Sequence, residues 1–468
     1  YQAAAMGGSG PELIYGPSDQ VGPFSVMNII KPLNDLFPDD YFNSFVKNAV
    51  VESNEKIWMV GDVVGNHLML IYNKKLIAEP PLNTDDLISL GKKLTIDKNG
   101  DGKMDQYGLV WNFTEPFFYV PWLGGFGEWL LNDDNTPNLN TQGNIKAFQF
   151  IKDLRDKHKI IPRECDYEIA NAMFKSGNAA MIINGDWSWG DYNGVVDFGI
   201  ARLPMISETG KWPTPLVSTK GYSININTSG KKLDKTIELM KFLTSSDTQL
   251  YFTQRLNSQP SSYMALQYPE VKNNLLIKES AKIIEVGRPM PIIPEMRAIW
   301  DVLREQYQGV LGGAISPEIA AKKSQINSIE QIAIMNEIIK PGLQAKVIKF
   351  LFIILIIFFC IQFVKSLKDI KNDYQKNYIA YIFFLPALLG ISMVVIFPFI
   401  YNILISISNY SLRTFNNWEI IGLYNYLSVF MDINFYSILL KTILWTVINI
   451  LFHVSIGVFL AVLINKTL

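Results

Sequence analysis

Residues 179–204 read AAMIINGDWSWGDYNGVVDFGIARLP, and this stretch indicates the fold of the first part of the chain. Its two apolar runs, 179–185 and 196–204, are bounded by glycine and proline, as buried strands commonly are. A further strand candidate, ELIYG, spans residues 12–16. Helical segments separate such runs along the chain, and this alternation predicts an α/β protein with largely parallel sheets.

Two segments carry the signals of helices. Residues 83–94 begin with a cap candidate, Asn83 or Thr84, and have aspartates in the first turn and lysines in the last. This order of charges complements the helix dipole. In the next helix, apolar residues recur every three positions, which predicts one face on the core. They are Ile145, Phe148, Ile151 and Leu154.

The whole chain has 18% charged residues and a net charge of −1, but the residues from about 347 onward are much more apolar than the residues before them. Three apolar stretches are expected to span a membrane as helices, at about 347–364, 378–407 and 438–464. The second and third are too long for core helices. For the first, a buried core helix is an alternative. The small net charge gives no reason to expect a nucleic-acid partner.

The orientation in the membrane follows from the loop between the first two expected spans. Residues 365–376 carry four lysines, which predicts that this loop is cytoplasmic. Three spans then place the large N-terminal part and residues 408–437 on the outer side and residues 465–468 inside. The expected location is a multi-pass position in the cell membrane, with the soluble part on the periplasmic or extracellular side.

Several chemistries are not supported by the sequence. Cys165 and Cys360 lie in different parts of the chain, so a disulfide framework is not expected. The three histidines lack zinc-ligand spacing. No phosphate-binding loop occurs, so this chain is not expected to hydrolyse ATP. Because Tyr1 starts in what reads as mid-helix and Leu468 directly follows a span, the chain is expected to be a fragment at both ends.

Ten tryptophans are present, and some lie where a ligand could reach them. Trp187 and Trp189 follow a predicted strand, Trp300 lies near the start of a helix, and Glu115 precedes an aromatic run. Aromatic rings stack on sugars while carboxylates bind hydroxyl groups. A single aromatic residue is more often part of the core. Acidic residues near Glu115 and Asp186 also allow a glycosidase, but sugar binding without catalysis accounts for them and for the membrane part.

Five segments, taken in order, resemble the bacterial maltose/maltodextrin-binding protein family. The family resemblance implies a type II periplasmic-binding-protein fold, with two α/β lobes that close on a sugar about a hinge. The segments are GPELIYGPSD (10–19), LMLIYNKKLI (68–77), NFTEPFFYVPWLGGFG (112–127), FKSGNAAMIINGDWSWG (174–190) and MPIIPEMRAIW (290–300).

The resemblance also implies which residues bind the sugar. These are Asp19, Asn66, Glu115, Phe117, Trp187, Trp300 and Arg304. The chain departs from the family pattern at Gly16 and Gln20, where maltose receptors have a tryptophan and an arginine, and at Asn66, where they have a glutamate. These departures argue against maltose itself, and a maltodextrin-like oligosaccharide is expected as the ligand.

From about residue 378 the chain resembles the permeases of maltose-type sugar importers, in segments 381–410 and 420–447. This implies a second permease subunit and a cytoplasmic ATP-binding subunit as partners, besides the carbohydrate and the lipid bilayer. The expected domains are a sugar-binding domain at 1–338, a linker at 339–346 and a permease region at 347–468. The lobes are expected at 1–66 with 219–275, and at 70–215 with 280–335.

Residues 97–108, DKNGDGKMDQYG, contain the first half of a calcium-binding loop. Asp97, Asn99, Asp101 and Asp105 stand at ligand positions, but Gly108 replaces the final glutamate. A structural calcium ion and a simple solvated turn remain alternatives, and no other cofactor is expected.

Two functions remain open. One is sugar uptake by a binding protein fused to its own permease, as a non-enzymatic component of an ABC importer. The other is a membrane-anchored sugar sensor or capture protein without a transport role. The permease-like second and third spans favour transport.

Overall fold

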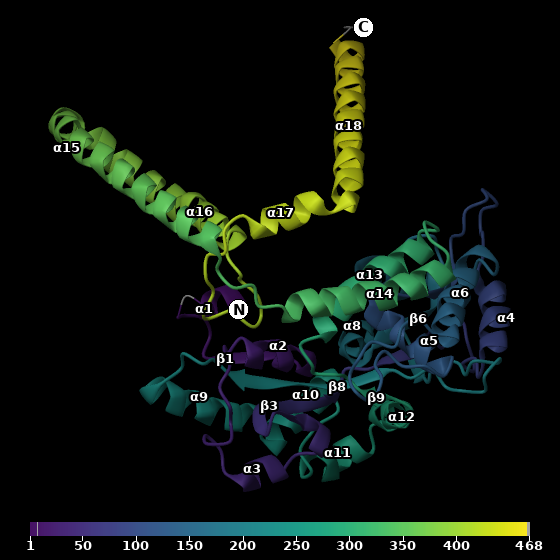
Figure 1. Cartoon of the computed structure of the whole chain (residues 1–468). Coiled ribbons are helices and arrows are strands. Elements are labelled where there is room, and N and C mark those ends of the chain that lie inside the picture. Colours follow the sequence, from purple (N-terminus) through teal and green to yellow (C-terminus); the bar gives the residue numbers. More distant parts are fainter. Residues whose placement is uncertain (7, 466–468) are drawn as a thin grey trace. The chain divides into compact units, whose positions relative to one another are not determined.

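The computed structural model describes residues 1–6 and 8–465 (Figure 1). It separates into two units, Tyr1–Glu337 and Ile338–Leu468. The expected cytoplasmic position of residues 466–468 lies outside the described residues, as does the side chain of Lys368.

Two sheets form the framework of the first unit. The first sheet has the order β1-β8-β3-β2, with β9 beside β8, and the second has the order β5-β6-β4-β7. The strands are β1 (Leu13–Pro17), β2 (Val50–Ser53), β3 (Lys56–Gly65), β4 (Leu68–Asn73), β5 (Tyr107–Val110), β6 (Ala179–Gly185), β7 (Phe198–Ala201), β8 (Leu216–Ile224) and β9 (Arg288–Pro289).

The pairing of these strands differs from the largely parallel sheets expected from the sequence. β8 runs antiparallel to β1 and β3, and β4 runs antiparallel to β6 and β7. Among the described pairs, only β5–β6 and β8–β9 are parallel. Neighbouring parallel strands need a crossover within one sheet, whereas β3 leads directly into β4 of the other sheet. The expectation of parallel pairing is therefore wrong, although the strands themselves are present.

Each sheet has its own hydrophobic core, and together they define two lobes. The second sheet lies in a large core with the fully buried residues Trp111, Trp122 and Phe148. The first sheet packs on two smaller clusters, which include Ile224 and Met240. Trp189, which the sequence placed near a possible ligand site, is fully buried in the large core.

The chain passes between the lobes at three places, which form the hinge. β3 contributes Val64 to the core of the first sheet, while β4 contributes Leu68 to that of the second. β8 spans both lobes, because Leu216 belongs to one core and Tyr222 to the other. The third passage precedes α12, which packs against β7.

The helices of the first unit cover both sheets (Figure 1). Helix α4 begins at Thr84 because the side chain of Asn83 accepts a hydrogen bond from the amide of Asp86, which confirms one of the two predicted caps. The helices are α1 (Gln2–Met6), α2 (Val21–Val26), α3 (Asp39–Asn43), α4 (Thr84–Leu94), α5 (Val120–Gly125), α6 (Gln142–Asp156), α7 (Tyr167–Lys175), α8 (Trp189–Tyr192), α9 (Gly230–Leu243), α10 (Ser246–Leu256), α11 (Pro269–Lys272), α12 (Leu275–Ile284), α13 (Met296–Leu311) and α14 (Pro317–Asn336).

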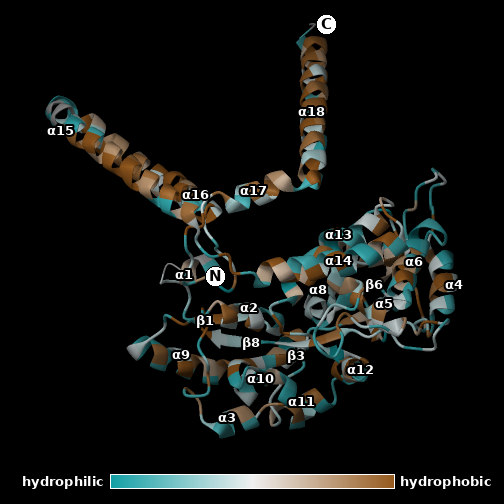
Figure 2. Ribbon diagram, viewed as in Figure 1, coloured by the Kyte–Doolittle hydropathy of each residue, from teal (hydrophilic) through white to brown (hydrophobic). Residues whose placement is uncertain are grey.

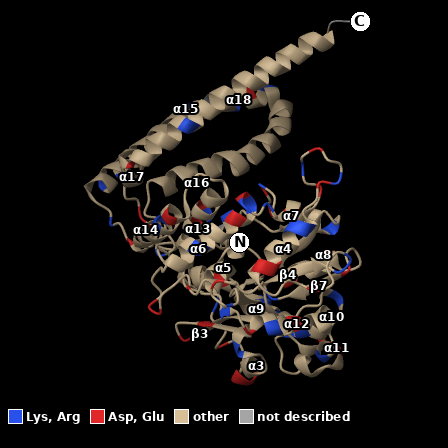
Figure 3. Ribbon diagram, turned by 90° about the vertical axis from the view of Figure 1, so that its right-hand side faces the viewer, with Lys and Arg blue, Asp and Glu red and all other residues tan. Residues whose placement is uncertain are grey.

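The second unit consists mainly of long apolar helices. Three of them are long and apolar enough to cross a membrane, at Leu343–Leu367, Asp373–Ser406 and Ile433–Asn465. None of the residues in their most apolar windows is buried, which argues against the core-helix alternative for the first. Figure 2 shows these helices largely brown, and Figure 3 shows few charges along them.

The first two of these helices differ in detail from the sequence expectations. Helix α15 (Leu343–Ile391) begins inside the segment expected as linker, and residues 365–376 are helical rather than a loop. A kink at Asn377, where φ is −128°, joins the two halves. A π-helical turn, Ser392–Ile396, leads into α16 (Phe397–Ser406), and α17 (Tyr424–Met431) precedes α18 (Ile433–Asn465).

Candidate functional site

A cavity of about 690 Å³ in the first unit brings together five of the seven predicted site residues. This cavity is called the main cleft below. The predicted residues that line it are Asp19, Glu115, Phe117, Trp300 and Arg304. Tyr1, Gln2, Gln20, Pro23, Phe24, Met290, Ile293, Met296, Arg297 and Asp301 line it as well.

One wall of the main cleft is a face of helix α13. Arg297, Trp300, Asp301 and Arg304 follow one another at helical spacing and therefore project to the same side. The opposite face is anchored in the large core by residues such as Leu303. Arg297 and Asp301 are absent from the set predicted by resemblance, although their spacing relative to Trp300 was a signal that could have identified them.

Arg304 forms two ion pairs in the main cleft, one with Glu115 and one with Asp301 of its own helix. Its Nη2 lies 3.0 Å from Oε2 of Glu115, and its Nη1 lies 2.8 Å from Oδ1 of Asp301. The hydrogen bond with Glu115 raises the pKa of Arg304, so the guanidinium stays charged. All three side chains are more than a third exposed, so these pairs add little stability. They mainly fix the orientation of polar groups toward the cleft.

Asp19 lies in the short helical turn Ser18–Gln20, directly after β1. Burial raises the pKa of its carboxyl group, and its Oδ1 atom is buried without a hydrogen-bond partner. An unpaired buried acceptor costs about 1–3 kcal/mol. A hydroxyl group of a ligand in the cleft could donate to this oxygen.

Trp187 lies beside the main cleft and lines a neighbouring cavity. Its ring centroid is 6.0 Å from that of Phe117, and its Nε1 donates to the hydroxyl of Tyr167 at 3.1 Å. Gly185 makes this position possible, because a Cβ atom there would lie 2.0 Å from the indole ring. The structure therefore places Trp187 at the border of the main cleft.

Asn66 lies in the hinge and lines neither of these two cavities. Its backbone is left-handed, with φ 42°, and its amide N donates to Oδ2 of Asp186 at 3.1 Å. Its side-chain Nδ2 donates to Oγ of Ser218 at 2.8 Å. Of the seven predicted residues, Asn66 alone lines neither cavity. Its side chain is hydrogen-bonded to Ser218 of β8 instead.

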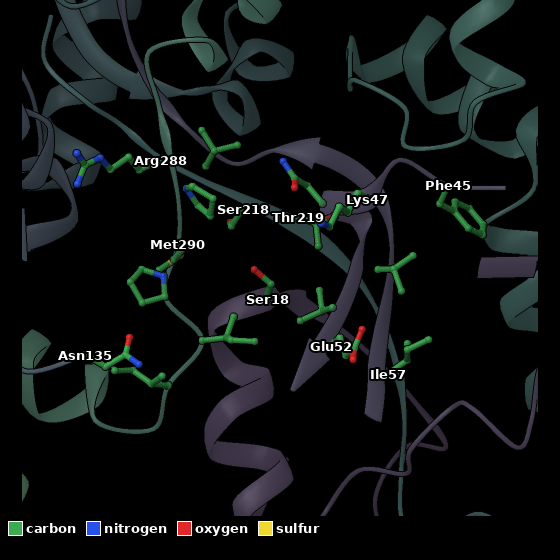
Figure 4. Close-up of a pocket in the computed structure, with 18 of the residues that line it drawn as sticks. Ser18, Phe45, Lys47, Glu52, Ile57, Asn135, Ser218, Thr219, Arg288 and Met290 are labelled. Atoms are coloured by element: carbon green, nitrogen blue, oxygen red, sulfur yellow. The ribbon is translucent and has the colours of Figure 1, made fainter. Parts of the chain in front are cut away.

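A larger cavity, of about 920 Å³, lies along β8 and β9 (Figure 4). In that view it separates Asn135 and Met290 on one side from Glu52 and Ile57 on the other. None of the predicted site residues lines it. Its one tryptophan, Trp129, is covered by the guanidinium of Arg288 at 4.9 Å from the ring centroid. This face of the Trp129 ring is therefore already in contact with a cation.

The candidate calcium loop is held by hydrogen bonds of its own. The two carboxylate oxygens of Asp97 accept from the amides of Gly100 and Gly102, at 2.7 and 2.8 Å. Oδ2 of Asp105 accepts from the amide of Lys98 at 2.7 Å. Within residues 1–6 and 8–465, no group of three or more acidic, histidine or cysteine side chains is placed to hold a metal ion.

The groups around the main cleft suit an uncharged, hydroxyl-rich ligand. Trp300 and Phe117 offer ring faces, while carboxylates, side-chain amides and Arg304 offer acceptors and donors. Stacking surfaces combined with a few hydrogen-bonding groups are the usual composition of a small-molecule cleft.

Comparison with known proteins agrees with this chemistry. Residues 1–279 match the family model described as bacterial extracellular solute-binding protein. The maltose/maltodextrin-binding domain MalE of Bdellovibrio bacteriovorus, solved with maltotriose, is 57% identical; the match covers 71% of this chain and 88% of that one, with a TM-score of 0.70.

Two more distant relatives show the same similarity. The maltotriose-binding protein of Thermus thermophilus is 25% identical, with a TM-score of 0.63, over 71% of this chain and 88% of that structure. The maltotriose-binding protein of Pyrococcus abyssi is 27% identical over 306 residues, which is 64% of this chain and 65% of that protein. This chain thus spans about two thirds of the Pyrococcus protein. The two-lobed periplasmic-binding-protein fold is confirmed, and these relatives are binding proteins, not enzymes.

Proposed function

Because the chain belongs to the bacterial extracellular solute-binding protein family, we propose that its first unit captures a maltodextrin-like oligosaccharide in the main cleft. The observation that carries this proposal is the convergence of Trp300, Phe117 and Glu115 on one cavity. The Bdellovibrio, Thermus and Pyrococcus relatives are named for maltodextrin or maltotriose binding. The loss of three family side chains at Gly16, Gln20 and Asn66 favours a ligand other than maltose.

Calorimetry on the full chain in detergent tests sugar binding. Maltotriose is expected to bind, and Trp300→Ala is expected to weaken binding by about 1–3 kcal/mol, the scale of a large aromatic contact. Trp212→Ala is the matched control, because Trp212 lies away from the main cleft, beside Arg202. No binding of any glucan, or equal effects of the two variants, would contradict the proposed ligand site.

We infer further that residues 347–468 form the first part of a permease, so that the chain is a component of an ABC sugar importer. A second permease subunit and a cytoplasmic ATP-binding subunit would complete it. Three apolar helices of membrane-spanning length support this proposal. In this arrangement the sugar-binding unit lies on the outer side of the cell membrane, and the lysine-rich residues 365–376 lie in the cytoplasm.

Cysteine labelling tests this orientation. In a chain with Ser366→Cys, a membrane-impermeant thiol reagent should not reach the new cysteine in intact cells, but should reach it after the cells are opened. A Cys360→Ser background removes the native thiol that is exposed on the same helix. Labelling of intact cells would place this segment outside and contradict the proposed topology.

The two candidate functions, transport and capture, differ in whether the tethered unit delivers sugar directly to the permease. Only six residues, 337–342, join α14 to α15, and they span at most about 20 Å. Such a tether gives an effective concentration on the order of millimolar. The reconstituted importer should therefore show sugar-stimulated ATP hydrolysis without an added receptor, and the stimulation should not fall on dilution. A requirement for a second soluble receptor would favour the capture protein.

A further inference from the structure

The loop between α16 and α17, residues 407–422, is folded on itself and is called the outer loop below (Figure 1). The carbonyl oxygen of Ile407 accepts hydrogen bonds from the amides of Ile421 and Gly422, at 2.8 and 3.1 Å, and these bonds close the loop at its base. The side chains of Ile407 and Ile421 are buried. Compact loops of this length that pack on their own side chains are frequently functional. The outer loop therefore has a defined surface that another segment can contact.

The segment that contacts the outer loop is the connection between the two units. Residues 337–342 join α14 to α15, and they are called the tether below. The carbonyl oxygen of Ile339, in the middle of the tether, accepts a hydrogen bond from Nδ2 of Asn409 at 2.9 Å. Because α14 ends at Asn336, this bond holds the chain only three residues after the last helix of the first unit.

The side chain of Asn409 is oriented for this contact by the outer loop itself. Its Oδ1 accepts a hydrogen bond from the amide of Glu419 at 2.7 Å, and its backbone amide donates to the carbonyl oxygen of Glu419 at 3.0 Å. A carboxamide has an acceptor end and a donor end, so a bond that fixes Oδ1 also fixes the direction of Nδ2. The outer loop therefore presents a donor, and the carbonyl of Ile339 is the acceptor that it meets.

A second contact lies at the first turn of α15, directly after the tether. Gly422 has a left-handed backbone, with φ 93°. A Cβ atom on Gly422 would lie 3.2 Å from Cβ of Gln344 and 3.5 Å from the backbone N of Ala345, so glycine allows the loop to approach the helix closely. Ala345 is only 1% exposed. The outer loop thus contacts the connection at two places, in the middle of the tether and at its end.

We propose that the outer loop anchors the tether, so that the connection to the sugar-binding unit does not swing freely. This inference rests on the proposed function, because the connection matters for delivery only if a fused receptor supplies its own permease. With Ile339 held, the part of the tether that can still move is three residues long and spans at most about 11 Å, about half the reach of the whole tether. A shorter reach confines the sugar-binding unit to a smaller volume and raises its effective concentration at the permease.

Electron paramagnetic resonance of a spin label in the tether tests the anchor. The label is attached to Lys340→Cys, at an exposed position, in the full chain in detergent. A Cys360→Ser background removes the other exposed thiol, whereas Cys165 is buried and is left in place. The chain with an unsubstituted outer loop should give a spectrum dominated by immobile label, because the neighbouring residue Ile339 is held by Asn409.

Asn409→Asp separates the anchor from the fold of the outer loop. The carboxylate can still accept from the amide of Glu419, but it cannot donate to the carbonyl of Ile339. The ratio of mobile to immobile label should therefore rise about fivefold or more, the effect of one net hydrogen bond. Asn417→Asp, at an exposed position of the same loop, is the matched control and should leave the spectrum unchanged. Gly422→Val should also free the label, because its side chain would displace the loop from the first turn of α15.

The comparison of these spectra decides the outcome. A mobile label in the chain with an unsubstituted outer loop, or equal spectra for Asn409→Asp and Asn417→Asp, would show that the tether is not anchored. The measurement needs neither sugar nor ATP, so its result is independent of the proposed function. A chain that holds the label but binds no sugar would contradict the proposed function and support the anchor, whereas a chain that binds sugar with a freely mobile label would contradict the anchor alone.

Discussion

The two units of the chain place the same kinds of apolar residue in opposite surroundings. In the first unit Phe148 is completely buried and stacks on Tyr119 at a centroid distance of 4.4 Å. In the second unit Phe452, in the middle of α18, is 58% exposed. Figure 2 shows α18 brown over most of its length, whereas the helices around the sheets are a mixture of brown and teal.

The difference in the exposure of apolar side chains indicates which surroundings each unit requires. A helix in water must turn its apolar face to a protein core, and it keeps polar residues on the other side. A helix that is apolar on all sides needs either complete burial or lipid. The three long apolar helices bury none of the residues in their most apolar windows, and their length and composition suit lipid.

The largest expected effect comes from a cavity in the core of the first unit. Phe148→Ala should lower the free energy of unfolding by about 3–5 kcal/mol, because it removes a fully buried ring from a packed cluster. Phe452→Ala is the matched substitution in α18 and should leave the unfolding of the first unit unchanged. Urea unfolding of the full chain in detergent, followed by tryptophan fluorescence, measures both. A loss below about 1 kcal/mol for Phe148→Ala would show that this core repacks easily.

Features that depend on neighbouring residues could be predicted from the sequence. The Asn83 cap and the core face of α6 follow from local spacing, and the structure confirms both, with Phe148, Ile151 and Leu154 fully buried. The three apolar helices were expected from length and composition, and the structure extends them by a few residues. Five of the residues that line the main cleft had been predicted, because the family resemblance supplied the pairing of distant segments.

Features that depend on long-range pairing could not be predicted. The antiparallel sheets arise because β8 lies between β1 and β3, which are about 200 and 160 residues earlier in the chain. The same pairing creates the cavity of about 360 Å³ beside Trp187, since it brings Lys220 beside Asp62 and Trp187. No local pattern marks a lone lysine in a strand as part of a cavity wall. Asn66 is the opposite case. The family resemblance predicted that it binds the sugar, but its side chain is hydrogen-bonded to Ser218.

An arginine introduced at equally exposed positions is expected to have different effects in the two units. Ile448 in α18 is 49% exposed, and Leu239 in α9 is 47% exposed. Ile448→Arg should oppose membrane insertion by about 2.5–3.5 kcal/mol, the cost of arginine at the centre of a spanning helix. Leu239→Arg should have little effect, because its position faces water.

Insertion of α18 can be measured by resistance to alkaline extraction from membranes together with protease protection. The expected result is a smaller inserted fraction for Ile448→Arg and an unchanged one for Leu239→Arg. Equal insertion of both variants would mean that this part of α18 faces a polar surface rather than lipid or packed helices.

A smaller effect is expected from pH, and only in the first unit. Burial raises the pKa of Asp62 from 3.8 to about 6, with Tyr15, Tyr222, Lys220 and Asp186 as the titratable groups around it. The folded state therefore favours the protonated carboxyl. This contribution to stability is present below about pH 4 and is lost as the pH rises through 6, by up to about 3 kcal/mol for a shift of two units.

The variant Asp62→Asn should remove this dependence. Its stability relative to the unsubstituted chain should be greater at pH 7.5 than at pH 4.5, as measured by urea unfolding of the first unit in the full chain. An equal difference at both pH values would show that Asp62 remains ionised in the folded protein. In that case the hydroxyl groups of Tyr222 and Tyr15 would be sufficient to stabilise its carboxylate.

The smallest effect is expected for calcium, in the loop at residues 97–105. We propose that this loop keeps its shape without a metal ion, because Asp97 already accepts two backbone amides. These hydrogen bonds, first of all the one from Gly102, lower the pKa of Asp97 and favour its ionised form. Replacing a chelator with millimolar calcium should therefore leave Tm unchanged, whereas Asp97→Ala should lower Tm slightly and equally in both conditions. A rise in Tm with calcium that Asp97→Ala abolishes would instead show that the loop binds the ion by releasing Asp97 from its amide partners.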